Sequence, residues 1–333
     1  MIIDMHCHIV PERFPVDADH DASNAFPVMQ PTDGGADMMI AGTKFRAFRD
    51  TAWDANKRVA DMPNIGVDKQ VLSPLPELLM YHLDPDDGAQ LARHLNEHIA
   101  TMIREQPDRY YGLGSVPLQD VELAVVELEH VKNLGLNGVE IRTNIEGQNL
   151  GDPKFRPFFR EATKLDLAIF VHANRATFMD RLSDIPETLG AEAALGFGIE
   201  CGLAGASLIW GGVLAEFPNL RVCMSHGGGV LTQMLARSDN NYRNRKAIEQ
   251  LLPEAPMEYA RRMYYDDLAW NVSTLRYLID NMGAKQVGIG TDYSGASVRT
   301  ISVEEEFEAL KLSSSEREQI SHTNAERFLG VDQ

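Results

Sequence analysis

The chain opens with MIIDMHCHIV (Met1–Val10), a short apolar run that ends in two histidines. Its apolar character predicts a buried strand, and strand alternation places His6 and His8 on the same face. Seven similar runs follow, each separated from the next by a segment long enough for a helix: Gly66–Leu75, Tyr110–Leu118, Gly138–Thr143, Leu167–Ala173, Arg221–His226, Arg262–Ala269 and Gln286–Asp292. Runs that are apolar throughout are typical of parallel strands covered on both faces.

The segments between these runs predict helices. Asp86–Pro107 is amphipathic and ends at a proline, and Val121–Gly135 ends at a glycine. Eight strand–helix units in 333 residues predict a (β/α)8 TIM barrel in the α/β class. A doubly wound sheet is the alternative, but no GxGxxG loop follows the first strand. Pro11–Asp54 has weak periodicity, so we expect an inserted loop region over the barrel mouth within a single domain, 1–333.

Composition restricts the function classes. Hydrophobic residues make up 44% of the chain and charged residues 24%, as in a globular protein with a sizeable core. The 31 basic and 49 acidic residues give a net charge of −18, which argues against a nucleic-acid partner. No apolar run reaches the roughly 20 residues of a membrane span, and the first residues do not resemble a signal peptide. Three scattered cysteines favour a reducing cytoplasm, so we expect a cytoplasmic protein without a membrane association.

Three more of the predicted strands end in residues suited to metal chemistry. His172 ends the fifth, His226 the sixth and Asp292 the eighth. All strand C-termini of a barrel meet on one face, where active sites lie, so these residues would gather with the first two histidines. Each residue alone is more often a hydrogen-bonded structural group. Together they predict a site for a divalent metal such as zinc.

Several motifs then connect the chain to a known family. Beside the HxH run they are FRAFRDTAWD (Phe45–Asp54), RYYGLGSVPLQD (Arg109–Asp120), SHGGG (Ser225–Gly229) and GTDY (Gly290–Tyr293). In this order they resemble the amidohydrolase superfamily, and more closely its non-oxidative decarboxylase branch, typified by α-amino-β-carboxymuconate-ε-semialdehyde decarboxylase. The resemblance covers nearly the whole chain.

The resemblance implies roles for individual residues. One zinc ion, with manganese as the alternative, would be held by His6, His8, His172 and Asp292. His226 would activate a metal-bound water as general base, and it or Asp292 would deliver the proton that replaces the carboxylate. No lysine ends the fourth strand, where binuclear relatives carry a carbamylated one, so a single metal is expected.

The resemblance also assigns arginines to the substrate. Arg46 would clamp its carboxylate, and Arg237 would reach into the neighbouring subunit's site in a homodimer. Arg142 and Glu140, at the end of the fourth strand, form either a structural ion pair or substrate contacts.

Two loops depart from the family pattern, at Asn174-Arg175 and at Ser294-Gly295. Because such loops face the substrate, the metal chemistry carries over better than the substrate's identity. The leading hypothesis is metal-dependent, cofactor-free decarboxylation of an aromatic or muconate-type acid. The alternatives are a hydrolase or hydratase acting on a ring-cleavage product or on a C–C, ester or lactone bond, and a barrel that binds metal without catalysis.

Overall fold

The computed structural model describes residues 1–15, 26–182, 184–186, 190–245, 252–295, 299 and 301–331. Eight strands pair in one sheet, and every pairing is parallel: β1 (Ile3–Ile9), β5 (Lys69–Pro74), β6 (Tyr110–Gly114), β7 (Gly138–Arg142), β10 (Ala168–His172), β11 (Val222–Met224), β12 (Tyr264–Asp266) and β13 (Val287–Gly288). Parallel bridges from Asp4 to Ile289 and from Cys7 to Tyr293 join the last strand to the first. The predicted TIM barrel is therefore confirmed, with every predicted strand in its place.

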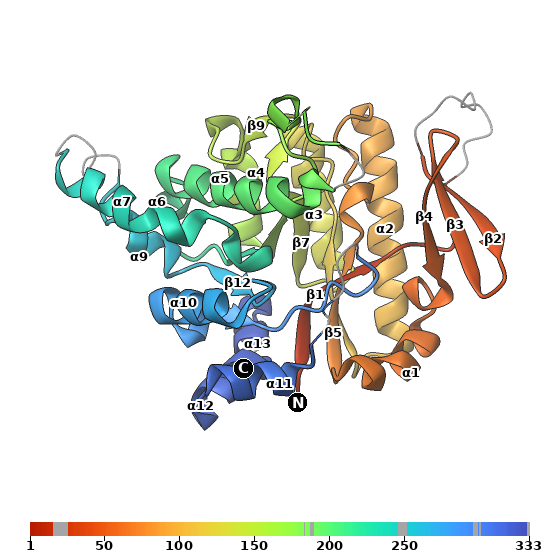
Figure 1. The fold of residues 1–333 in the computed structure, drawn as a ribbon. Helices are drawn as coiled ribbons and strands as arrows, with labels where there is room; N and C mark the ends of the chain where they lie inside the picture. Colours follow the sequence, from red (N-terminus) through yellow and green to blue (C-terminus); the bar gives the residue numbers. More distant parts are fainter. Residues whose placement is uncertain are drawn as a thin grey trace.

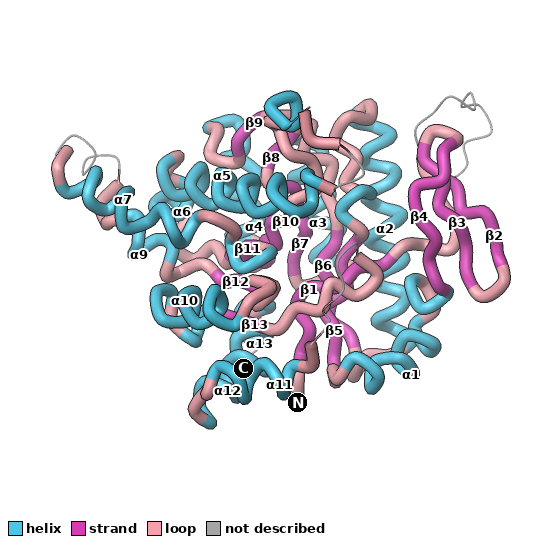
Figure 2. The backbone as a smooth tube through the Cα atoms, in the orientation of Figure 1, coloured by secondary structure: helices cyan, strands magenta, loops and turns pink. Residues whose placement is uncertain are grey.

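Helices surround the barrel on the outside (Figures 1 and 2). They are α1 (Ala55–Ile65), α2 (Pro85–Glu105), α3 (Val121–Asn133), α4 (Arg156–Lys164), α5 (Phe197–Trp210), α6 (Val213–Glu216), α7 (Leu231–Arg243), α9 (Pro256–Ala260), α10 (Val272–Met282), α11 (Val303–Leu310), α12 (Ser314–Glu318) and α13 (Asn324–Leu329). Capping side chains fix where several begin. Asp54, Asp120 and Asn271 each accept hydrogen bonds from backbone N–H groups in the first turn of α1, α3 and α10. These starts in turn fix the loops that leave the barrel mouth.

The insertion after β1 contains a small sheet as well as loops. Strands β2 (Val28–Thr32), β3 (Gly35–Ile40) and β4 (Thr43–Arg49) pair antiparallel and stand beside the barrel next to α2 (Figure 1). Met38 and Phe48 are buried in a cluster with Leu91 and Leu95 of α2. The expectation of a loop region alone was incomplete. The small sheet buries few side chains, so its sequence shows almost no alternation of apolar and polar residues.

One continuous helical stretch, Glu192–Trp210, is long and apolar enough to cross a membrane by length and composition alone. In this fold it includes α5, which packs against α7 and β10. Core helices of barrels share this composition, so the stretch is weak support for a membrane span.

Candidate metal centre and active site

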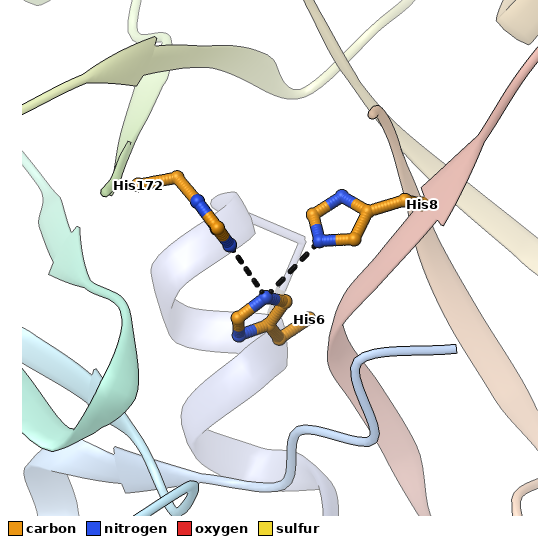
Figure 3. A group of neighbouring side chains, drawn as sticks. All are labelled: His6, His8 and His172. Carbon is orange, nitrogen blue, oxygen red and sulfur yellow. Dashed lines mark hydrogen bonds between the residues drawn. The ribbon is translucent and has the colours of Figure 1, made fainter. Parts of the chain in front are cut away.

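Three histidines from two strands meet at the mouth of the barrel (Figure 3). Nε2 of His6 lies 3.2 Å from Nε2 of His8 and 2.9 Å from Nε2 of His172. Oδ1 of Asp292 lies 3.3 Å from Nε2 of His8 and 3.8 Å from Nε2 of His6. The structure therefore brings together all four residues expected to bind metal.

The other ring nitrogen of each histidine, Nδ1, shows that these four groups suit a metal ion. Nδ1 of His6 faces a carboxylate oxygen of Asp266 at 2.6 Å, Nδ1 of His8 faces the carbonyl of Pro74 at 3.1 Å, and Nδ1 of His172 faces the carbonyl of Ala173 at 2.5 Å. An Nδ1 that donates to an acceptor leaves a lone pair on Nε2 of the neutral ring. Three lone pairs and a carboxylate thus converge. Ligand atoms that lie about 3 Å from one another can each lie roughly 2 Å from a shared cation. These residues therefore fit a divalent metal.

Two strand ends place these ligands by backbone hydrogen bonds. The backbone N–H of Asp292 donates to the carbonyl of His6 at 2.9 Å. Just before it, Thr291 donates through its N–H and its hydroxyl to the buried carboxylate of Asp4, at 3.0 and 2.6 Å. Asp4 also accepts from the N–H of His6 at 3.2 Å. The first and last strands are therefore held together directly beneath the ligands.

Asp266, at the end of β12, supports the centre from behind. Its side chain is fully buried and accepts hydrogen bonds from His6 Nδ1 and from the backbone N–H groups of His226, Gly227 and Leu268, at 2.6, 2.8, 2.9 and 3.1 Å. Burial alone would lower the pKa of His6, but the hydrogen bond to Asp266 and the charges of Asp266, Asp292 and Glu140 raise it to about 9, so the metal-free ring carries a second proton that a bound ion would displace. Asp266 therefore makes His6 a stronger electron-pair donor.

His226 lies beside the ligands in the SHGGG turn. Its ring centroid is 5.0 Å from that of His172 and 5.3 Å from that of His6. Within the described part of the chain, neither of its ring nitrogens has a hydrogen-bond partner. Burial, and then the neighbouring charge of His6, lowers the pKa of His226 to about 4, so the ring is neutral at physiological pH.

The turn that presents His226 needs its glycines. His226 and the three residues after it all have positive φ. A Cβ on Gly229 would lie 1.9 Å from the carbonyl oxygen of Gly198, and one on Gly228 would lie 2.7 Å from the ring of Tyr265. Backbone this close to its neighbours in the left-handed region excludes larger residues.

A cavity of about 200 Å³ opens above these groups. His8, His172, His226 and Asp292 contribute to its lining, as do Glu77 and Asn174. Its remaining walls are largely apolar and aromatic, with Leu75, Phe197, Leu268, Trp270 and Leu278 among them. Phe197 stacks on His226 with the ring planes 16° apart. A slot of this kind suits a flat, partly apolar molecule with a polar end.

The three arginines expected to bind substrate lie in different places. Arg46, on β4, is not one of the residues that line the cavity, but its Nη2 is 3.8 Å from a carboxylate oxygen of Glu77, which does line it. Arg142 is buried at the end of β7 and lines a neighbouring cavity of about 340 Å³ together with Arg175. Arg237 is exposed on α7, one turn beyond the cavity-lining Gln233.

Glu140 is not an ion-pair partner of Arg142 in the contacts that the structure describes. Its carboxylate lies 3.8 Å from Nδ1 of His8, and burial raises its pKa to about 8. Arg142 instead approaches Glu146, at 3.5 Å.

The sequence reasoning missed three residues of this site: Asp266, Glu77 and Trp270. Asp266 was missed because the predicted strand ran on to Ala269, whereas β12 ends at Asp266 in the structure. Glu77 and Trp270 lie in loops without a recognisable pattern, and only the fold places them at the cavity.

Comparisons with known proteins agree with this geometry. The sequence profile of the amidohydrolase family matches residues 3–331. A 2-amino-3-carboxymuconate-6-semialdehyde decarboxylase from Dictyostelium discoideum is 34% identical, covering 99% of this chain and 92% of its own length. A gamma-resorcylate decarboxylase from a Rhizobium species is 28% identical, covering 80% and 84%.

A solved structure extends the comparison to a bound metal. The 5-carboxyvanillate decarboxylase of Novosphingobium aromaticivorans, complexed with manganese and 4-hydroxy-3-methoxy-5-nitrobenzoic acid, is 26% identical with a TM-score of 0.72. The match covers 84% of this chain and 82% of that one. With a family profile spanning the barrel and a relative this similar over its whole length, the chain belongs to the amidohydrolase superfamily, in its branch of non-oxidative decarboxylases.

Proposed function

We propose that this chain catalyses the metal-dependent, cofactor-free, non-oxidative decarboxylation of an aromatic or muconate-type carboxylic acid. The observation that carries the proposal is the convergence of three histidine Nε2 atoms and Asp292 at the floor of an apolar slot. Beside them lies His226, whose ring nitrogens have no hydrogen-bond partner in the part of the chain that the structure describes. The names of the relatives, all decarboxylases of such acids, support the same reaction.

In this proposal His6, His8, His172 and Asp292 hold one divalent metal. Three imidazoles and one carboxylate favour zinc, whereas the carboxyvanillate relative holds manganese. When bound, the ion would supply Lewis-acid polarisation of the substrate. Asp266 holds the ring of His6 in the orientation that presents Nε2 to the ion.

His226 handles the proton. As a neutral ring whose nitrogens have no hydrogen-bond partner among the described residues, it is placed to accept a proton and to pass it to the substrate. Burial keeps the pKa of His226 low, so the protonated ring is a strong enough acid to give that proton to carbon. The proton, from His226 or Asp292, adds to the carbon that bears the carboxylate. The C–C bond then breaks, its electron pair stays on the substrate, and CO2 leaves.

Arg46 is assigned to the substrate's carboxylate. Its Nε and Nη2 have no hydrogen-bond partner among the described residues, although both are buried. A planar guanidinium with these N–H groups available beside Glu77 suits a carboxylate bound at the polar end of the slot. Arg142 would contribute only to a substrate long enough to reach the neighbouring cavity.

The test is incubation of the metal-loaded protein with a panel of aromatic and muconate-type acids, followed by mass spectrometry and CO2 detection. A product lighter by about 44 mass units, the mass of CO2, supports the proposal. A product heavier by about 18 units identifies hydration or hydrolysis and refutes decarboxylation.

We also propose a homodimer in which Arg237 completes the partner's site. Its side chain is not among the described residues that line its own chain's cavity, although Gln233, one turn earlier on α7, is. Beside it, α5 and α7 expose an apolar face that contains Leu203, Trp210, Val230 and Met234. Contiguous apolar surface of this kind marks protein–protein contacts, and a second copy is the simplest cover.

Mixing two inactive variants, Arg237→Ala and His172→Ala, tests the shared site. After subunit exchange, half of the dimers are mixed and each has one intact site, so up to about a quarter of wild-type activity should return. No recovery despite proven exchange would refute a shared site.

A single-domain, cytoplasmic enzyme completes the proposal. The packing of the small β2–β4 sheet on α2 of the barrel supports a single domain. Cys7, Cys201 and Cys223 are buried and free, which suits a reducing compartment.

A further inference from the structure

Trp270 stands at the open end of the cavity. It lies in the connection between β12 and α10 (Figure 1), and its residue surface is 55% exposed. The cavity-lining groups at the other end are buried, with His8 at 0% and His172 at 4% exposure. The cavity therefore runs from the histidines at its floor to Trp270 at its mouth.

The backbone of Trp270 is strained. Its φ is +58°, a left-handed conformation that bulky side chains rarely adopt. Contacts on both sides hold it there. The N–H of Ala269 donates to the carbonyl of Asp267 at 2.7 Å, and Asn271 caps α10. A half-exposed indole buries little surface to offset this strain, and such outliers cluster at ligand sites.

The chemistry of the cavity changes along its length. Its floor is polar and holds the histidines and Asp292, and Glu77 adds a carboxylate to its lining. Around Trp270 the lining is mostly apolar, with Leu268, Ala269 and Leu278, and Thr274 in the first turn of α10 adds one hydroxyl. A molecule bound with its carboxylate at the floor would point its opposite, apolar edge at the indole.

We propose that Trp270 is a specificity-determining residue that covers the apolar edge of an aromatic acid, the edge opposite the carboxylate. This inference rests on the proposed function for the orientation of the substrate. It narrows the substrate class to aromatic acids with an apolar substituent on that edge. Contact with the ligand would bury the exposed face of the indole. The free energy gained offsets the backbone strain at Trp270 only in the complex.

A binding experiment tests this without turnover. Metal-loaded protein is titrated with 4-methyl-3-nitrobenzoate, a nitroaromatic acid that carries an apolar methyl group opposite its carboxylate and quenches tryptophan fluorescence on contact, and the affinity is measured in parallel by calorimetry. We expect Trp270→Gly to weaken binding about tenfold, the order of magnitude of one lost aromatic contact plus its buried area. An unchanged affinity would overturn the proposal.

Stability separates ligand contact from a structural role. Glycine accepts a φ of +58°, so Trp270→Gly should leave the melting temperature of the metal-free protein unchanged or raise it. A fall in both melting temperature and affinity would assign Trp270 to the folding of its loop and overturn the proposal.

Trp270→Phe provides a second test that does not depend on the glycine variant. The quenching of fluorescence should be lost in Trp270→Phe and kept in the matched control Trp53→Phe, since Trp53 does not line the cavity. Quenching that persists in Trp270→Phe would overturn the proposal. Failure of the wild-type protein to release CO2 from any acid, with these binding results intact, would refute the proposed function alone.

Discussion

Asp266→Asn is the most informative single change, because it alters how His6 is held without touching a ligand. The asparagine keeps one side-chain oxygen, which still accepts from the N–H groups of Gly227 and Leu268. Its amide nitrogen replaces the oxygen that faces His6 Nδ1 at 2.6 Å and the N–H of His226 at 2.8 Å. The N–H groups of the asparagine then face the N–H groups of His6 and His226, so neither hydrogen bond can form.

The structure sets the size of the effect. A hydrogen bond to a charged group contributes about 1.5–3 kcal/mol, so losing the one to His6 should weaken metal binding about 10- to 150-fold. Replacing a residue that hydrogen-bonds to a metal ligand typically lowers metal affinity about 10- to 100-fold, which agrees with this range. The loss of the bond to the N–H of His226 adds a destabilisation of the SHGGG turn, so the melting temperature should also fall.

Competition with a chromophoric chelator measures the metal affinity, and thermal melts with and without metal measure stability. Asp267→Asn is the matched control. Asp267 is also buried beside the end of β12, but it pairs with Arg299 and accepts from the N–H of Gly290. The control should lose stability and keep its metal affinity. Metal binding as tight as wild type in Asp266→Asn, or an equal loss in Asp267→Asn, would refute the reasoning.

Three further results are expected. His172→Ala should hold well below one metal per chain by elemental analysis and lose turnover, and full occupancy with normal activity would disprove the ligand assignment. His226→Asn should keep about one metal while its rate falls roughly 10²–10⁴-fold, the cost of losing a general acid–base; equal loss of metal would make His226 a ligand. Burial, and then the charge of His94, lowers the pKa of His98 to about 4, below the roughly 6.5 of the unfolded chain. The unfolded state therefore binds the proton more tightly, and up to about 3 kcal/mol of stability is lost as the pH falls from about 6.5 to 4. Urea unfolding of metal-free His98→Gln should show a smaller loss over that range than wild type, and an identical loss would refute the assignment.

The barrel was predictable because its signal is local and repeated. Each buried parallel strand is an apolar run, and each run is followed by a helix with its own start or stop, such as Asp120 before α3. Once the barrel is assumed, its geometry alone brings His172 and Asp292 next to His6, although the chain separates them widely. The candidate metal ligands could therefore be predicted from the order of the strands alone, without knowledge of side-chain packing.

The rest of the site depends on contacts that have no sequence period. The tautomer of His6 is set by Asp266, 260 positions away, and its role appears only when β12 takes its place in the barrel between β11 and β13. Trp270 is an ordinary exposed aromatic in the sequence. Its positive φ arises because Asp267 and the Asn271 cap fix the chain on both sides. The residues proposed to hold the metal are thus specified by the fold, whereas those proposed to select the substrate are specified by the conformation of individual loops. Substitution in such loops can change the acid that fits while leaving the metal centre intact.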